Sequence, residues 1–151
     1  SAHYRQPVNF TEETVNSAKV EINKIQMALK QAALLLQVNN IDIDNGKPTY
    51  INNFVNSLAD DLNTANALME LFNVVKEINA LVRNKDADLN ILNDLFRTLL
   101  DMLDVLGIPL DYVKLDEYDK KTYQNYIEYK NKKDFEKSDL YRKILIEKGI
   151  M

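Results

Sequence analysis

The sequence contains no cysteine and no tryptophan, and it has only one histidine, His3. Without cysteine the chain can form neither disulfides nor thiolate zinc sites, and it has no cysteine nucleophile. A single histidine near the N-terminal end also removes most metal-ligand and general-base arrangements, because these depend on histidine. We therefore expect no metal site and no catalytic residue, and a chain so poor in these side chains is not a complete enzyme.

Glycine and proline are also scarce, with three of each among 151 residues, whereas 46% of the residues are hydrophobic. This composition is typical of a folded, helix-rich domain and not of a disordered chain. No apolar run approaches the roughly 20 residues that a membrane span needs, and no signal-peptide pattern opens the chain. We expect a cytoplasmic protein without a membrane partner.

Acidic residues outnumber basic ones in most of the chain, and the balance reverses toward the C-terminus. Residues 1–113 contain 9 Lys and Arg against 15 Asp and Glu, whereas residues 114–151 contain 10 against 8. A polyanionic partner is therefore attracted more strongly to the last third of the chain. An excess of two positive charges is weak evidence by itself.

A long helix is predicted between Thr11 and Val38. Thr11 is a suitable N-cap, because its hydroxyl can accept a hydrogen bond from an otherwise unpaired amide of the first turn. The apolar residues of this segment alternate steps of three and four, so they form one seam that needs a partner helix. They are Val15, Ala18, Ile22, Ile25, Leu29, Ala32 and Leu36.

The segment Asp60–Val82 is predicted to contain the central helix, with Thr64 as its N-cap. Its apolar arc is broad, which implies neighbours on more than one side of the helix. The arc consists of Ala67, Leu68, Leu71, Phe72, Val74, Val75, Ile78, Leu81 and Val82.

Two further helices complete the predicted bundle. Thr49 can cap a short helix that reaches Ala59, and Asp86 or Asp88 begins another that Gly107 ends. Four helices with matching apolar seams predict an all-α fold, an antiparallel four-helix bundle. We assign residues 1–111 to this bundle domain, with residues 1–10 as an N-terminal connector, and residues 108–115 are the best candidate for a linker.

Residues 112–151 are predicted to form a helical hairpin with a basic elbow. Asp116 and Asp134 are suitable N-caps for its two helices, and tyrosines alternate with lysines along it. Tyrosine and lysine together suit base stacking and phosphate contact in RNA recognition. The alternative is a solvated lysine-rich face with the tyrosines packed in the seam, and composition alone favours it. The predicted apolar face of the second helix is Leu140, Ile144 and Leu145.

Three segments of the chain resemble the cysteinyl-tRNA synthetase family. SAHYRQPVNFTEE (1–13), FVNSLADDLNTANAL (54–68) and KNKKDFEKSDLYRKILIEKGI (130–150) are similar to its motifs and follow in the same order across nearly the whole chain. The third segment is the most specific. Ala65 stands where the family usually has proline, Tyr129-Lys130 replaces Ala-Arg, and Ser138 replaces alanine.

The resemblance implies a helical DALR-type domain and, in residues 112–151, the start of a truncated anticodon-binding region. It implies that the catalytic domain precedes Ser1 and that the parent enzyme is an ATP-dependent cysteine–tRNA ligase in which zinc holds the cysteine thiol. The implied partners are cysteine-specific tRNA and the catalytic domain of the same chain. The fragment itself is expected to bind no cofactor and to be inactive alone, acting as a stiff spacer that contacts tRNA.

The resemblance also suggests roles for individual residues. Carboxylates repel phosphate, so we expect Asp60 and Asp61, with the adjacent Asn63 and Thr64, to fix the helix bend or the domain junction. The candidates for docking on the catalytic domain are His3, Tyr4 and Arg5. The candidates for tRNA backbone contact are Lys130, Lys132, Lys133, Lys137, Arg142 and Lys143.

Two alternatives remain open. An ion pair with Asp139 is a competing use of Arg142, because the two residues lie one helical turn apart. The whole chain can also be read as a free-standing helical adaptor, whose apolar seams or tyrosine-rich hairpin bind another protein.

Overall fold

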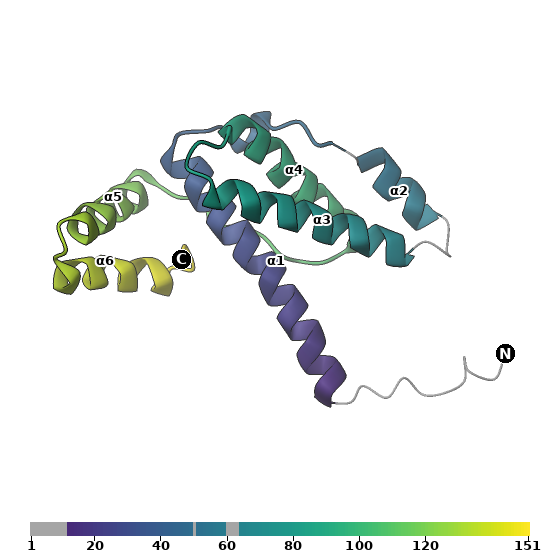
Figure 1. The fold of residues 1–151 in the computed structure, drawn as a ribbon, viewed down its shortest axis with the longest axis horizontal. Helices are drawn as coiled ribbons and strands as arrows, with labels where there is room; N and C mark the ends of the chain where they lie inside the picture. The colour runs from purple at the N-terminus through teal and green to yellow at the C-terminus, as the bar shows by residue number, and fades with distance from the viewer. Residues whose placement is uncertain (1–11, 50, 60–63) are drawn as a thin grey trace.

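The computed structural model describes residues 12–49, 51–59 and 64–151, and over these ranges the chain is helical without strands (Figure 1). The all-α fold class is therefore confirmed. The elements are α1 (Glu12–Val38), the 3₁₀ turn η2 (Ile43–Asn45), α2 (Ile51–Ala59), α3 (Thr64–Arg83), α4 (Leu89–Leu106), α5 (Glu117–Asn131) and α6 (Phe135–Glu147).

Helices α1 to α4 share one hydrophobic core, which we call the bundle. Helix α3 packs against α1, α2 and α4, as expected of a central helix. Phe54 of α2, Ile78 of α3 and Phe96 of α4 are fully buried in this core. The regular antiparallel order of a four-helix bundle stays a prediction.

The first half of α1 departs from the predicted seam. With 27 residues α1 is about 40 Å long, and its N-terminal half extends beyond the other helices (Figure 1). Ala18 is consequently exposed, and Ile22 is 44% exposed, whereas the seam is buried from Ile25 onward. The periodicity correctly predicted the helix, but it overestimated how much of the helix packs against the rest of the bundle.

A second difference concerns α3, where the buried face lies slightly to one side of the predicted stripe. Leu68 is 39% exposed, while Ala67 and Val74 are buried. The apolar stripe that the sequence of α3 predicts is therefore wider than the surface that the neighbouring helices bury.

The loop between α1 and α2 lies along α4. The N–H of Thr49 donates to the hydroxyl oxygen of Thr98 at 2.8 Å, and the amide of Asn93 donates to the carbonyl of Asp42 at 2.9 Å. A Cβ at Gly46 would lie 2.9 Å from the carbonyl oxygen of Asn93, so only glycine allows this close approach. Helix α2 begins at Ile51, and residue 50 before it is not described, so the capping role expected of Thr49 stays a prediction.

The ends of α4 follow the prediction. Asp88 is the N-cap, and its side chain accepts the N–H of Asn90. Gly107 ends the helix with φ 70°, a left-handed conformation that glycine adopts without strain. None of the helices in the described part of the chain is long and apolar enough to cross a membrane.

Candidate nucleic-acid interface

Helices α5 and α6 form the predicted hairpin, and both predicted caps are present. Asp116 caps α5 in a capping box, in which its side chain accepts the N–H of Asp119 and the Asp119 side chain accepts the N–H of Asp116. Asp134 caps α6 by accepting the N–H of Lys137. The hairpin is thus defined by local hydrogen bonds that the sequence already indicates.

The elbow, residues 130–134, joins the two helices at the end of the hairpin far from the bundle (Figure 1). Lys133 adopts a left-handed conformation with φ 60°. Its N–H donates to the carbonyl of Lys130 at 3.0 Å, and the N–H of Asp134 donates to the carbonyl of Tyr129 at 2.9 Å. These bonds complete the last turn of α5 and reverse the chain within a few residues.

The tyrosines of the hairpin pack mainly on one another. The rings of Tyr129 and Tyr141 stack across the two helices, 5.7 Å apart and nearly parallel. Tyr126 is buried, and its ring lies 6.1 Å from that of Tyr123. This arrangement supports the alternative in which tyrosines fill the seam, and it leaves Tyr118, 64% exposed, as the most accessible ring of the hairpin.

The six predicted contact cations are all exposed, and the structure divides them by their partners. Lys132 pairs with Glu128 at 2.9 Å, and this hydrogen bond raises the pKa of Lys132. Lys137 lies 3.9 Å from the Asp134 carboxylate and 5.2 Å from the centre of the Tyr129 ring. Lys130 lies 5.7 Å from the centre of the Tyr126 ring.

The other three cations, Lys133, Arg142 and Lys143, like Lys130, have no acidic partner within ion-pair distance among the described residues. In particular, the ion pair between Asp139 and Arg142 does not form, although both residues are described. Because an α-helix turns about 100° per residue, Lys137 and Lys143 point about 120° apart on α6. The cations therefore extend from the elbow to the second half of α6 and do not line a single face.

The other end of the hairpin is closed by a charged contact that the sequence reasoning missed. The Nζ of Lys148, just after α6, lies 2.6 Å from a carboxylate oxygen of Asp119 in α5. Burial alone would raise the pKa of Asp119, but hydrogen bonds from Lys148 and from the N–H of Asp116 outweigh it and lower the pKa. The same bond raises the pKa of Lys148. Residues 29 positions apart carry no sequence signal for such a pair.

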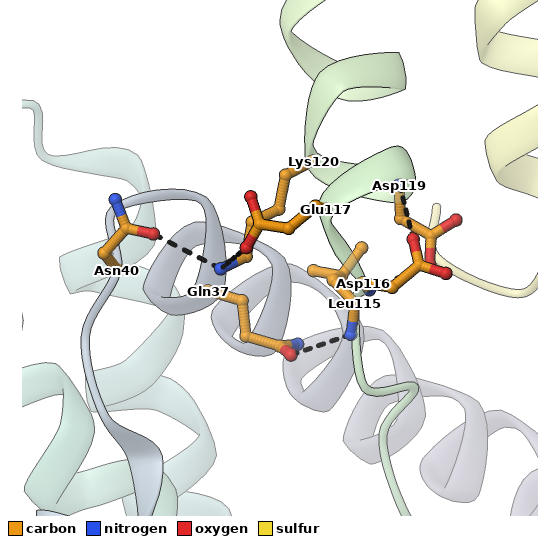
Figure 2. Close-up of polar contacts among 7 residues, drawn as sticks. All are labelled: Gln37, Asn40, Leu115, Asp116, Glu117, Asp119 and Lys120. Atoms are coloured by element: carbon orange, nitrogen blue, oxygen red, sulfur yellow. Dashed lines mark hydrogen bonds and ion pairs between the residues drawn. The ribbon is translucent and has the colours of Figure 1, made fainter.

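The hairpin packs on the last turns of α1, which the sequence reasoning also did not predict. Leu34 of α1 contacts the small hairpin core of Tyr126, Leu145 and Ile150. The Nζ of Lys120 donates to the side-chain oxygen of Asn40 at 3.2 Å (Figure 2). On α6, Leu145 is buried and Ile144 half-buried as predicted, but Leu140 is 62% exposed. Leu140 lies on the side of α6 that neither α5 nor α1 covers.

The predicted junction residues cannot be placed. The expectations for His3, Tyr4, Arg5, Asp60, Asp61 and Asn63 fall outside the described residues. Thr64 is the first residue of α3, and its side chain also lies outside the description.

The described residues offer no side-chain cluster suited to zinc, and the sequence has no glycine-rich loop suited to the phosphates of ATP. No group of three or more His, Cys, Asp and Glu side chains in the described ranges is arranged to hold a metal ion. The three glycines, Gly46, Gly107 and Gly149, are far apart in the sequence and form no glycine-rich phosphate loop.

Comparison with known proteins gives the family context. Residues 53–111, which cover most of α2 together with α3 and α4, match the DALR domain. The whole chain aligns with a cysteine–tRNA ligase of Oceanobacillus iheyensis at 30% identity over 160 residues, covering 34% of that protein. It aligns with a cysteine–tRNA ligase of Acinetobacter baumannii strain ATCC 17978 at 30% identity over 166 residues and with one of Halalkalibacterium halodurans at 28% over 159 residues, each again covering 34% of the relative.

The chain spans about a third of the length of these curated relatives, and all of it is aligned. No solved structure matches it significantly. The chain is therefore similar over its whole length to a segment of the cysteine–tRNA ligases, and it contains a region that matches the DALR domain.

Proposed function

We propose that this chain is the tRNA-binding and spacer segment of a cysteine–tRNA ligase. In this proposal the bundle holds the hairpin at a fixed distance from a catalytic domain, and the elbow contacts the tRNA backbone. The observation that carries it is the set of six exposed cations that extends from the elbow to the second half of α6; four of them, Lys130, Lys133, Arg142 and Lys143, have no acidic partner in the described structure. Unpaired lysine and arginine side chains can neutralise phosphates without first breaking an ion pair.

The tyrosines contribute less than their number suggests. Tyr129 is stacked on Tyr141, and Lys132 and Lys137 lie near its ring, so opening this stack to admit a base would cost existing contacts. We infer that the hairpin binds through phosphates and not through base stacking. Recognition of this kind is sensitive to salt and nearly insensitive to sequence.

The chemistry of the relatives belongs, in this proposal, to another part of the protein. The relatives are named as cysteine–tRNA ligases, and the present chain aligns with a third of their length. We infer that ATP, zinc and the cysteine substrate are bound outside residues 1–151. In the described ranges no cluster of side chains is arranged to hold a metal ion.

The test is fluorescence anisotropy of labelled cysteine tRNA, titrated with the chain at several salt concentrations beside a non-cognate tRNA. Replacing Lys133, Arg142 and Lys143 by alanine should weaken binding and lower the slope of log K against log salt by about two to three units, or roughly one for each phosphate that is no longer neutralised. The charge-matched control replaces Lys19, Lys76 and Lys85, three exposed lysines outside the hairpin, and should leave the slope unchanged.

Either of two results would contradict the proposal. The wild-type chain could fail to bind tRNA even at low salt, or the control replacements could lower the slope as much as the hairpin replacements do. A preference for the cognate tRNA would extend the proposal, because backbone contact alone does not discriminate between sequences.

A further inference from the structure

The connection between bundle and hairpin is held against α1 by glutamine side chains. The carbonyl of Asp111 accepts a hydrogen bond from the amide of Gln26 at 3.4 Å, which is a long contact. The side-chain nitrogen of Gln37 donates to the carbonyl of Val113 at 3.0 Å, and its side-chain oxygen accepts the N–H of Leu115 at 2.9 Å (Figure 2). A segment that the sequence predicts as a linker is therefore fixed at both sides of Lys114.

Gln37 pairs with alternate residues of this segment as a neighbouring strand would. Residues 113 and 115 offer a carbonyl and an N–H in the same direction, and the Gln37 amide presents a donor and an acceptor side by side. The second hydrogen of the same nitrogen donates to the carbonyl of Ala33 at 3.2 Å, one turn back in α1. This third bond fixes the orientation of the amide, so both atoms face the connection.

The remaining contacts between hairpin and bundle gather around the same side chain. Ile150, at the end of the chain, lines a small cavity together with Gln37, Leu34 and Val113. Lys120 of α5 reaches Asn40, one turn beyond Gln37. Helix α1 is the bundle helix against which α5 packs, so the last turns of α1 determine how the hairpin is directed.

We propose that Gln37 is the positioning residue that fixes the direction in which the hairpin extends from the bundle. Its importance for RNA rests on the proposed function, because direction matters only if the elbow meets a ligand of defined shape. The amide is suited to this task because it donates and accepts at once. Methionine has a similar length but offers no donor, and ionised glutamate can only accept.

The test measures the distance distribution between two spin labels by electron paramagnetic resonance. Because the chain has no cysteine, Lys76→Cys in α3 and Glu136→Cys in α6 provide two unique attachment sites, and both positions are exposed. The labelled parent should give one narrow distribution. Gln37→Met should broaden it about twofold, as expected when a fixed connection becomes a hinge. Gln26→Met, which removes only the long contact, should leave it narrow.

Gln37→Glu provides a second test, because lowering the pH should restore the narrow distance distribution. A side chain that only fills space would show no such response to pH. Near neutral pH the carboxylate accepts from Leu115 but repels the carbonyl of Val113, so the distribution should be broad. Below a pH of about 4 the protonated carboxyl group again donates and accepts, and the distribution should narrow. Lys30, Lys114, Lys120, Asp42 and Asp44 line the same cavities as Gln37, and Asp116 follows Leu115 in the chain, so the parent is measured at the same pH values.

The proposal would be overturned if Gln37→Met gave the same distance distribution as the parent. It would also be overturned if the distance distribution of Gln37→Glu did not change with pH under conditions in which that of the parent stays narrow. If circular dichroism shows that Gln37→Met has lost helix content, that variant is set aside, and the pH response of Gln37→Glu tests the proposal. In the tRNA titration, Gln37→Met should weaken binding several-fold without changing the salt slope, since every cation is retained. If the parent binds no tRNA, the proposed function fails, but the result on hairpin direction still stands.

Discussion

The bundle and the hairpin are stabilised in different ways. Among the described residues, the bundle buries a cluster of nineteen apolar residues from α1 to α4 and the turn η2, whereas the hairpin cluster has three buried members, Tyr126, Leu145 and Ile150. The hairpin compensates with helix caps, the contact between Asp119 and Lys148, stacked tyrosines and its attachment to α1. Apolar burial is the larger source of stability, so we expect the hairpin to open locally at a lower free energy than the bundle unfolds.

The largest expected effect is a break in the bundle core. Phe96 of α4 is fully buried, and its ring contacts that of Tyr112 edge-to-face at 5.2 Å. Phe96→Ala should lower the free energy of unfolding by about 3–5 kcal/mol, because it removes apolar contacts and leaves a cavity. Urea denaturation followed by circular dichroism measures this change.

The matched control for that prediction is Ile91→Ala on the same helix. Ile91 is exposed, and its truncation should change stability by no more than about 0.5 kcal/mol. Equal effects of the two substitutions would mean that α4 does not contribute its buried face to the stability of the chain.

A smaller effect is expected at the helix caps, where the two parts can be compared directly. Asp116→Ala removes the cap of α5, and Asp88→Ala removes the cap of α4. Each should cost about 1 kcal/mol. Amide hydrogen exchange should separate them: Asp116→Ala accelerates exchange in α5 and α6 only, whereas Asp88→Ala leaves hairpin protection unchanged. Uniform acceleration across the chain by Asp116→Ala would show that both parts unfold together.

The smallest effect is a pH dependence confined to the hairpin. The pKa of Asp119 is lower in the folded state than in the unfolded chain, so its contribution to stability is complete above the ordinary value of about 3.9 and is lost as the pH falls through the folded value. The pKa of Lys148 is raised, so its contribution is lost only as the pH rises past the ordinary lysine value of about 10.4. Amide hydrogen exchange of the hairpin, followed by nuclear magnetic resonance between pH 2 and 7, measures this effect. At the acid end, exchange should be faster than the intrinsic pH dependence of amide exchange predicts.

Asp119→Asn is the variant that sharpens this test. It removes the titrating carboxylate, so the acid-dependent part of hairpin opening should disappear, while the bundle amides behave as in the parent. An unchanged acid response in Asp119→Asn would assign the effect to other carboxylates.

Sequence predicted those features of the fold that depend on neighbouring residues. The caps at Asp88, Asp116 and Asp134 were predicted, because each joins a side chain to a backbone group within three residues of it, and the stop at Gly107 was predicted because glycine adopts the left-handed conformation without strain. Exposure was harder to predict. Ile22 and Leu140 are exposed although they lie in apolar patterns, because burial depends on where neighbouring helices end.

The candidate interface was predicted in the same partial way. Sequence located the cations of the elbow and of α6, but it could not show that Tyr129 stacks on Tyr141 or that Arg142 lacks the expected partner Asp139, since both depend on side-chain conformations within the hairpin. The attachment of the hairpin through Gln37 was not predicted at all. Its partners lie 76 and 78 residues away, and glutamine on a helix surface carries no signal of such a contact.

The tyrosine seam of the hairpin also gives the molecule an uneven optical signature. The chain has no tryptophan, and six of its eight tyrosines fall within residues 112–151. Ultraviolet emission therefore comes mainly from the connection and the hairpin, where Tyr129 and Tyr141 stack and Tyr123 lies close to Tyr126. Five of the eight tyrosines lie in the hairpin, whereas Tyr112 packs on Phe96 of the bundle, so tyrosine emission is weighted toward the smaller part of the protein.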